Sequence, residues 1–237
     1  MAKVPFFRAS IDEDDIDRVT AVLRTDFLTT GPVAAELEAN LAQYTDTNAA
    51  ITVTSCTAAL HLCLVALDIR PGDEIITTPM TFVATANAIV HAGAKPVFVD
   101  VEPETGNIDV AKVEAAITDR TRAVMPVHLY GQMVDMVGLN EVAEARGIEI
   151  IEDAAHALES RRGSVSLGSH SRAACLSFYA TKNITSGEGG AIVTRDSEFA
   201  DRLRKLRLHG MTAGAADRYT GTYRHYGVTE PGWKYNM

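Results

Sequence analysis

Residues 49–69, AAITVTSCTAALHLCLVALDI, contain the pattern that decides the fold class. The first five residues are apolar or β-branched, and a short run of that kind is typical of a buried strand. Small residues from Ser55 to Ala59 lead into a longer apolar stretch that predicts a helix, which ends before the turn at Pro71 and Gly72. A strand that runs directly into a helix is the repeating unit of a parallel sheet covered by helices.

The same alternation of strand and helix continues along the rest of the chain. Further strands are expected at residues 73–79, 95–101, 122–131, 148–154, 173–180 and 190–196. Helices are expected at residues 11–25, 31–46, 81–93, 107–118, 136–147 and 196–210. The sequence therefore predicts an α/β fold of three layers, α/β/α, with a mainly parallel central sheet.

The bulk composition narrows the class of protein. The chain has 237 residues, of which 46% are hydrophobic and 22% charged, and a formal net charge of −9. Nucleic-acid binding needs an excess of basic residues, so we expect no nucleic-acid partner. The sequence has no apolar run long enough to cross a membrane, and its N-terminal stretch is acidic where a signal peptide is apolar. We therefore expect a cytoplasmic protein with no membrane partner.

Cysteine and histidine usage argues against two other kinds of site. Cys56, Cys63 and Cys175 are odd in number and lie inside apolar stretches, where thiols usually behave as small core side chains. The seven histidines lack the short paired spacings that are typical of metal sites. We expect neither disulfides nor a metal centre.

The first candidate binding residues follow the strand at 49–53. Ligands of an open α/β sheet collect at the carboxyl ends of its strands. Small residues at 55–59, including Thr57 and Ala58, lie at such an end and begin a helix, where free N–H groups and the helix dipole favour a phosphate. A capped helix without any ligand explains the same residues.

Asp153 is the second candidate, because it ends the predicted strand IEIIED with Glu152 beside it. A carboxylate in apolar surroundings needs a partner. The Asp153 carboxylate could cap a helix or form a surface ion pair, or it could keep a pyridine nitrogen protonated. His156, three residues further on, could orient that acid or touch a bound ring, although a lone histidine is more often structural.

Lys182 is the third candidate. It is one of six lysines and follows another predicted strand, 29 residues after Asp153. A lysine among apolar and small residues can have its amine pKa lowered by desolvation, which makes the amine nucleophilic toward an aldehyde. Taken alone, Lys182 is more simply interpreted as an exposed loop lysine.

Taken together, the three sites supply what pyridoxal 5'-phosphate (PLP) requires. They are a phosphate cradle at 55–59, an acid for the ring nitrogen at Asp153 and an amine at Lys182, in the chain order of the aspartate aminotransferase-like fold. Ser177 could add a hydroxyl to the phosphate, and Phe82 could either lie flat on the ring or be a core aromatic. The sequence therefore predicts PLP as the cofactor.

At this point the sequence closely resembles the DegT/DnrJ/EryC1/StrS family of sugar-nucleotide aminotransferases. The resemblance covers essentially the whole chain through a series of motifs in the family's order: FLTTGP, TSCTAALHL, PMTFVATANAI, GAKPVFVDVEPETGNID, PVHLYGQ, IEDAAHA, LSFYATKNITSGEGG and GWKYNM. It implies that Lys182 is the Schiff-base lysine, that Asp153 is the partner of the pyridine nitrogen and that Phe82 is the stacking aromatic. His156 matches the position close to the ring.

The resemblance also implies how the phosphate is bound. Ser177 and the region of Thr57 and Ala58 correspond to the phosphate ligands, and Asn236 matches the residue that reaches the phosphate of a neighbouring subunit. One residue departs from the family pattern, because Cys56 stands where the family commonly has glycine. The close approach of backbone to phosphate must therefore tolerate a side chain there.

The activity implied by the resemblance is the transfer of an amino group from glutamate to a nucleotide-linked keto-sugar. In that reaction Lys182 would act as the general base and acid that moves a proton between the amino-acid carbon and the cofactor. A homodimer with shared active sites is expected. A dehydratase of the same family is the related alternative. Lys182 argues against it, because the resemblance implies that the dehydratase branch has lost its lysine at this position.

The domain organisation follows from the same comparison. We expect residues 1–211 to form the large, PLP-binding domain of a fold-type I enzyme, with an N-terminal helical segment at 1–30, and residues 212–237 to form an irregular tail. Because family members continue beyond the YNM motif into a smaller C-terminal domain, the resemblance implies that this domain is absent and that the chain is truncated.

A catalytically impaired PLP-binding or regulatory fragment is therefore an alternative function. A nucleotide-binding α/β domain is a weaker one, because GxGxxG and GxxxxGK[ST] motifs are missing.

An anionic nucleotide-linked sugar needs cations nearby. The run of basic residues near the end of the chain could supply these cations, but an ordinary solvent-exposed helix face explains it as well. We therefore assign none of these residues as a substrate contact. The run and the tail beyond it contain Arg202, Arg204, Lys205, Arg207, His209, Arg218, Arg224 and His225.

Overall fold

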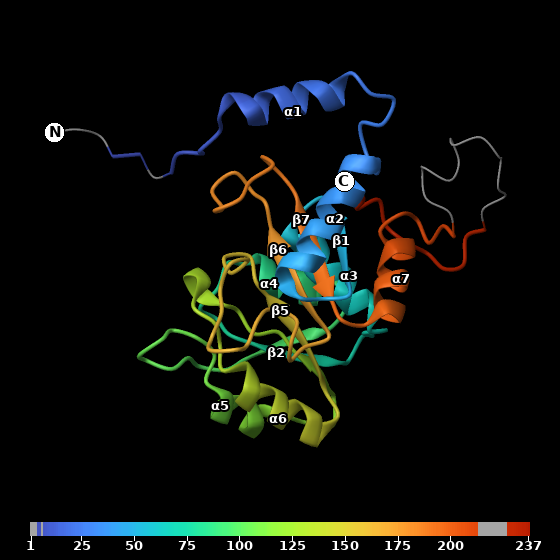
Figure 1. Cartoon of the computed structure of the whole chain (residues 1–237). Coiled ribbons are helices and arrows are strands. Elements are labelled where there is room, and N and C mark those ends of the chain that lie inside the picture. Colours follow the sequence, from blue (N-terminus) through green and yellow to red (C-terminus); the bar gives the residue numbers. More distant parts are fainter. Residues whose placement is uncertain (1–3, 6, 213–226) are drawn as a thin grey trace.

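A seven-stranded sheet forms the centre of the protein, whose computed structural model describes residues 4–5, 7–212 and 227–237 (Figure 1). The strands lie in the order β1-β7-β6-β5-β4-β2-β3. Their bounds are β1 (Ala49–Val53), β2 (Glu74–Thr77), β3 (Lys95–Phe98), β4 (Thr121–Val124), β5 (Glu149–Asp153), β6 (Ala173–Ser177) and β7 (Gly190–Thr194).

The sheet is mostly parallel, as the alternation of strand and helix predicts. The pairs β6 with β5, β5 with β4, β4 with β2 and β2 with β3 are all parallel. Only β7 runs the other way, between β1 and β6. Because β1, β5 and β6 run in one direction, their carboxyl ends meet at the same edge of the sheet, and the candidate residues follow these ends.

The helices cover both faces of the sheet. Successive side chains of a strand point to opposite faces, and in β6 Cys175 packs into one hydrophobic cluster while Leu176 packs into the other. The first cluster contains residues of α3, α4 and α7, and the second contains residues of α2, α5 and α6. The predicted three-layer α/β/α architecture is therefore confirmed. The helices are α1 (Glu13–Leu23), α2 (Pro32–Thr45), α3 (Cys56–Ala66), α4 (Ala84–His91), α5 (Val110–Ala116), α6 (Met136–Arg146), α7 (Ser197–Leu206) and the 3-10 turn η1 (Leu129–Gly131).

The strand predicted at 122–131 is shorter than expected. It ends at Val124, and η1 occupies the last part of the predicted range. Pro126 has no N–H group to donate to a neighbouring strand, so the regular ladder stops there. The chain stays extended for a few residues, because Asp153 donates its N–H to the carbonyl of Pro126 and accepts one from His128. These bonds attach the loop after β4 to the end of β5.

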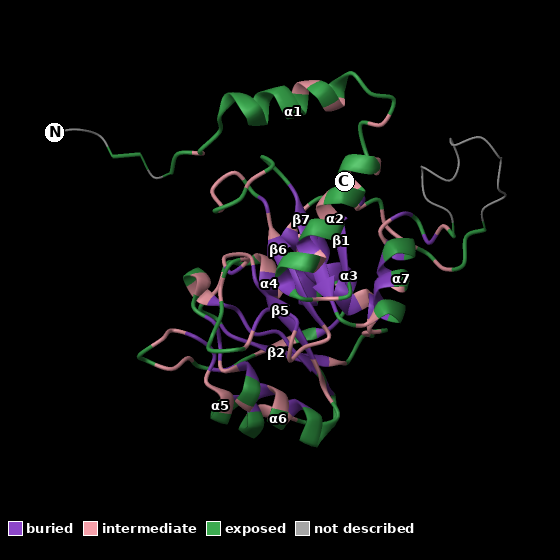
Figure 2. Ribbon diagram, viewed as in Figure 1, coloured by how far each residue is buried: buried purple, intermediate pink, exposed green. Residues whose placement is uncertain are grey.

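Helix α1 lies apart from the sheet and its covering helices (Figure 1). The sequence favours a helix because Asp12 and Asp15 form a capping box at its start. None of its residues is buried, and Figure 2 shows it as exposed or intermediate along its whole length.

Residues 227–237 fold back onto the body although they contain only isolated bridges and no helix or strand. Trp233 donates its N–H to the carbonyl of Leu206, and Tyr235 donates its N–H to the carbonyl of Arg207. Both aromatic rings pack against the first hydrophobic cluster. This segment is therefore attached to the end of α7 and to the core.

Candidate active site

Asp153 is the last residue of β5, and its carboxylate is held from two sides. Thr85 of α4 donates its hydroxyl to Oδ2 at 2.7 Å, and the backbone N–H of Ala155 donates to Oδ1 at 3.2 Å. Asp153 is 6% exposed and Thr85 is fully buried. Bonds to both oxygens fix the orientation of the carboxylate at the carboxyl edge of the sheet.

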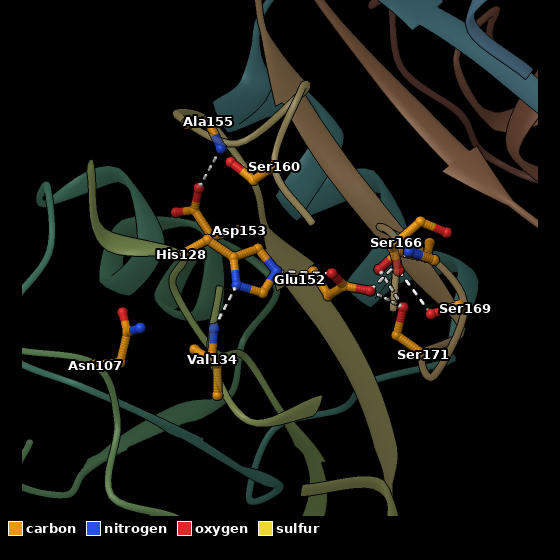
Figure 3. Close-up of polar contacts among 12 residues, drawn as sticks. Asn107, His128, Val134, Glu152, Asp153, Ala155, Ser160, Ser166, Ser169 and Ser171 are labelled. Atoms are coloured by element: carbon orange, nitrogen blue, oxygen red, sulfur yellow. Dashed lines mark hydrogen bonds and ion pairs between the residues drawn. The ribbon is translucent and has the colours of Figure 1, made fainter. Parts of the chain in front are cut away.

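The neighbouring acid, Glu152, belongs to a separate network on the other face of β5. Its carboxylate accepts hydrogen bonds from His128 Nε2 at 2.7 Å, from the N–H of Gly168 at 2.9 Å and from the hydroxyl of Ser171. His128 Nδ1 accepts the N–H of Val134, so Nε2 carries the ring proton. Figure 3 shows the Glu152 and Asp153 carboxylates pointing away from each other. Glu152 is thus satisfied internally, and Asp153 is the acid available to a ligand.

A cavity of about 280 Å³ lies beside this edge of the sheet. Its wall is formed by the loop after β5, by η1 and by the loop after β6, and the residues that matter here are Tyr130, His156, Ser177 and Lys182. Lys182 is half-buried, and its N–H donates to the carbonyl of Tyr179 in a turn just after β6. Burial lowers the pKa of the Lys182 amine below its ordinary value, while the charge of Asp153 opposes that shift.

The side chains of Lys182 and Asp153 belong to the same site. Burial, and then the charge of Asp153, raises the pKa of the Cys56 thiol well above its ordinary value, while the charge of Lys182 acts in the opposite direction. Asp153 is paired with Cys175 on the neighbouring strand β6, and Ala154 and Ala155, which follow Asp153, line the same cavity as Lys182. The structure therefore brings together two of the three anchors that the sequence predicts.

His156 is on the cavity wall with its ring stacked against that of Tyr130. The two ring centroids are 5.7 Å apart and the rings are within 3° of parallel. Burial, and then the charge of Lys182, lowers the pKa of His156 below its ordinary value, whereas Asp153 opposes the shift. This shift favours the neutral imidazole of His156, which lines the same cavity as Lys182.

The start of α3 supplies the third predicted anchor. Ser55 caps this helix by accepting the N–H of Ala58 on its side-chain oxygen at 3.1 Å. In the part of the chain that the structure describes, the N–H groups of Cys56 and Thr57 have no hydrogen-bond partner. Free N–H groups at the positive end of a helix dipole favour an anion such as phosphate.

Sheet register brings Ser177 near that helix start. Gly190 of β7 is paired with Val53 at the end of β1 on one side and with Ser177 at the end of β6 on the other. A Cβ on Gly190 would lie 2.5 Å from the carbonyl carbon of Ser55 and 2.6 Å from the nitrogen of Cys56. Glycine thus allows the start of α3 to pack directly on the sheet.

Cys56, which stands where the family commonly has glycine, does not obstruct the helix start. Its side chain is buried, and its Sγ donates toward the carbonyl of Cys175 on β6 at 3.5 Å. The thiol therefore points into the body of the domain. The exposed edge of the first helical turn remains backbone.

These residues fit PLP. The free N–H groups at Cys56 and Thr57 match a phosphate, the fixed carboxylate of Asp153 matches a protonated ring nitrogen, and the amine of Lys182 matches an aldehyde. Each chemical group of the cofactor thus has a residue of suitable chemistry at the same edge of the sheet.

Of the predicted residues, His156, Ser177 and Lys182 line the cavity, while Thr57, Ala58 and Asp153 lie at the same edge of the sheet without lining it. Phe82 and Asn236 lie apart from these residues. Phe82 is 77% exposed just before α4, one turn away from the Thr85 that holds Asp153. Asn236 is buried elsewhere, where its side chain donates to Thr29 at 3.4 Å and accepts from Lys234. Their roles as stacking aromatic and phosphate ligand stay predictions.

The three arginines in the described part of the basic run form internal ion pairs, and Arg204 pairs with Asp201. Arg202 binds Asp68 and Glu230, and Arg207 binds Glu38. Within the described residues, none of this run lines the cavity at Lys182. Arg218, Arg224 and His225 lie outside the residues that the structure describes.

Two residues at the site are additional to those the sequence singled out. Thr85 holds Asp153 although the two are 68 residues apart, and its only local signal is a hydroxyl inside the apolar run FVATANAIV. Tyr130 stacks on His156 from a turn that the sequence predicts as strand. Neither contact has a signature in local spacing.

Comparison with known proteins identifies the class. Residues 9–237 match the DegT/DnrJ/EryC1/StrS aminotransferase family, so the chain belongs to this family. The spore coat polysaccharide biosynthesis protein SpsC of Bacillus subtilis is 46% identical over 236 residues, covering 99% of this chain and 60% of that protein. The UDP-4-amino-4-deoxy-L-arabinose–oxoglutarate aminotransferase of Shewanella sediminis is 45% identical over 236 residues, and this match also covers 99% of this chain and 60% of that protein.

Solved structures agree with this assignment. The Helicobacter pylori aminotransferase PseC, involved in the biosynthesis of pseudoaminic acid, is 31% identical with a TM-score of 0.89, and the match covers 98% of this chain and 61% of that one. The sugar aminotransferase Spr1654 of Streptococcus pneumoniae in its PLP form is 34% identical with a TM-score of 0.89, and the match covers 100% of this chain and 63% of that one. The family and this PLP-form neighbour indicate PLP as the cofactor. The chain spans about 60% of the length of the curated relatives it matches.

Two further observations concern the described residues only. None of their helices is long and apolar enough to span a membrane. No group of three or more His, Cys, Asp or Glu side chains among them is arranged to hold a metal ion.

Proposed function

We propose that this protein is a PLP-dependent aminotransferase that moves an amino group from glutamate to a nucleotide-linked keto-sugar. The observation that supports this most strongly is that Lys182 lines the cavity together with Ala154 and Ala155, which directly follow the Asp153 carboxylate and its two hydrogen-bond donors at the end of β5. Its relatives include a UDP-linked sugar aminotransferase that uses oxoglutarate, which supports glutamate as the donor. The alternative fragment function remains open to the test below.

The chain's own residues have distinct tasks in this reaction. PLP, when bound, supplies an aldehyde that joins to amines and a ring that withdraws electrons. Lys182 Nζ would hold the cofactor through that aldehyde and, as a free amine, would move a proton as general base and acid. Its lowered pKa leaves a larger share of neutral amine at pH 8 than an ordinary lysine has.

Asp153 and the start of α3 hold the cofactor in place. The Asp153 carboxylate would stabilise a positive charge on the ring nitrogen, and Thr85 fixes the oxygen Oδ2 of that carboxylate. The N–H groups of Cys56 and Thr57 would hold the phosphate, with the hydroxyl of Ser177 nearby. His156, whose pKa is lowered, lines the cavity with Lys182.

A homodimer is part of the proposal. Several large apolar side chains near the site are exposed, which is typical of a surface covered by a partner. We expect a second copy to cover them, and a cytoplasmic location, because the three cysteines are free buried thiols as is usual in a reducing compartment. The exposed apolar residues are Met80, Phe82, Val83, Tyr179 and Ile184.

The first half of the reaction can be measured without knowing the sugar. The PLP-loaded chain is mixed with ¹⁵N-glutamate, and the expected product is about one oxoglutarate per bound PLP, with ¹⁵N retained on the protein-bound cofactor. Unlabelled glutamate and the Lys182→Ala variant are the controls, and the variant is expected to lose the product at least a hundredfold. PLP bound to Lys182 with no oxoglutarate formed would instead establish a binding-only fragment.

The second half is measured with UDP- and dTDP-linked 4-keto-hexoses. The ¹⁵N-loaded protein is expected to release an aminated sugar nucleotide, detected by mass spectrometry as the mass of the ¹⁵N-amino product. Release of ¹⁵N only to added oxoglutarate or pyruvate, with every keto-sugar inert, would contradict a sugar acceptor.

A further inference from the structure

Tyr130 combines two features that a purely structural residue does not need. The residue is 84% exposed at the wall of the cavity, and its backbone is left-handed, with φ of 51° and ψ of 28°. A non-glycine residue with such a φ is uncommon, and a bulky side chain there is strained. Folding alone would favour glycine or asparagine at this position.

The turn that holds Tyr130 is rigid. Buried Asn107 binds both its ends, accepting the N–H of Leu129 at 3.1 Å and donating to the carbonyl of Gln132 at 2.9 Å. Ser160 donates its hydroxyl to the carbonyl of Gly131 at 2.6 Å. The backbone that carries Tyr130 is therefore held against the loop after β5, and the Tyr130 ring stacks on His156 of that loop.

The His156 ring lies nearly parallel to the Tyr130 ring and is offset from it, with the two centroids 5.7 Å apart. The Tyr130 side chain is exposed, and its phenol makes no hydrogen bond within the described part of the chain. A fixed, flat aromatic surface at a cavity wall is the typical platform for a ligand with a flat or apolar face.

We propose that Tyr130 is a substrate-positioning residue whose exposed ring face stacks on the hexose of the nucleotide-linked sugar. This inference rests on the proposed function and deepens it. The C–H groups on one face of a sugar ring carry slight positive charge, which the negative face of an aromatic ring attracts. Tyr130 shares a cavity of about 280 Å³ with Lys182, so the group it contacts is the one that must reach the amine.

The sugar fits this position better than the nucleotide. The carbon that receives the amino group belongs to the hexose, so the hexose must enter the cavity with Lys182, and the diphosphate and base must extend outward. A contact to the non-reacting part of a substrate positions the reacting carbon and improves the rate of the chemical step.

The test compares binding of UDP-glucose and dTDP-glucose with that of UDP and dTDP, by calorimetric titration of the PLP-loaded chain. Tyr130→Gly removes the ring and suits the left-handed backbone, so it avoids misfolding through strain. We expect Tyr130→Gly to weaken binding of the nucleotide sugar about tenfold, while binding of UDP or dTDP changes less than about twofold. Tyr130→Phe, which keeps the ring face, is expected to bind within about threefold of the native chain.

Tyr44→Ala is the matched control, because Tyr44 is also exposed but lies on α2 and not on the cavity wall. Equal weakening of nucleotide and nucleotide sugar in Tyr130→Gly would assign the ring to the base or diphosphate and overturn the inference. Unchanged binding of both, or no binding of either nucleotide sugar by a native chain that holds PLP, would also overturn it. Failure of the native chain to hold PLP would overturn the proposed function itself.

Discussion

At the scale of single residues, the site depends on how two charged groups are desolvated. Two donors, the Thr85 hydroxyl and the N–H of Ala155, replace water at the Asp153 carboxylate. Burial lowers the pKa of the Lys182 amine, and the charge of Asp153 opposes that shift only in part. A carboxylate with two fixed donors and an amine pushed toward its neutral form suit the ring nitrogen and the aldehyde of PLP.

The lowered pKa of Lys182 can be measured without any cofactor. The rate of acetylation of Lys182 by dilute acetic anhydride, followed by peptide mass spectrometry across pH 6 to 12, reports the fraction of neutral amine. The midpoint is expected below 10.5, the ordinary value for a lysine, because burial disfavours the ammonium. Asp153→Asn should lower the midpoint further, since the Asp153 charge raises this pKa. A midpoint at or above the ordinary value would be inconsistent with a desolvated amine.

The bond between Thr85 and Asp153 can be measured with a double-mutant cycle. Thr85→Val keeps the volume but removes the hydroxyl that donates to Oδ2 at 2.7 Å, and Asp153→Ala removes the acceptor. We expect the two changes to be coupled by about 1–3 kcal/mol in the free energy of unfolding, the range for a hydrogen bond to a buried charge. Strictly additive effects in urea unfolding would show that the two side chains do not interact.

At the scale of elements, the ends of β1, β5 and β6 bring the candidate residues to one edge. The sequence predicts this arrangement because each of these strands is an apolar run followed at once by polar residues. It does not predict the antiparallel β7 between β1 and β6, because pairing between distant strands leaves no local periodicity. It also predicts a strand beyond Pro126 where the structure has η1, since Tyr130 adopts a left-handed turn that its residue type does not favour.

Gly190 tests the packing of α3 on the sheet. In Gly190→Ala the new Cβ would lie within 2.8 Å of backbone atoms of Ser55, Cys56 and Leu176, none of which can rotate away. We expect a loss of about 1–3 kcal/mol in the free energy of unfolding and a weaker affinity for PLP, because the start of α3 must shift. Gly227→Ala is the control, since no atom lies within 4 Å of its added Cβ. Equal stability and PLP affinity in the two variants would refute the close approach.

At the scale of the whole molecule, the anchors come from segments far apart in the sequence. The phosphate cradle at 55–59, Asp153 and Lys182 meet only because the mostly parallel sheet aligns three strand ends. Strand-end position and residue type are visible in the sequence, so these three could be predicted. Thr85 and Tyr130 could not, because their contacts with Asp153 and His156 arise from tertiary packing. The roles assigned to Phe82 and Asn236 need a second copy or a bound cofactor to be tested.

The most direct test of the account is to locate PLP on the chain. The 237-residue protein is incubated with PLP, reduced with borohydride, digested and analysed by mass spectrometry, with Asp153→Ala and Lys182→Ala in parallel. We expect one pyridoxyl group per chain on Lys182, none in Lys182→Ala, and occupancy at limiting PLP reduced severalfold in Asp153→Ala. A label spread over other lysines such as Lys95, or equal labelling in the Lys182→Ala variant, would contradict the claim that Lys182 and Asp153 form one cofactor site.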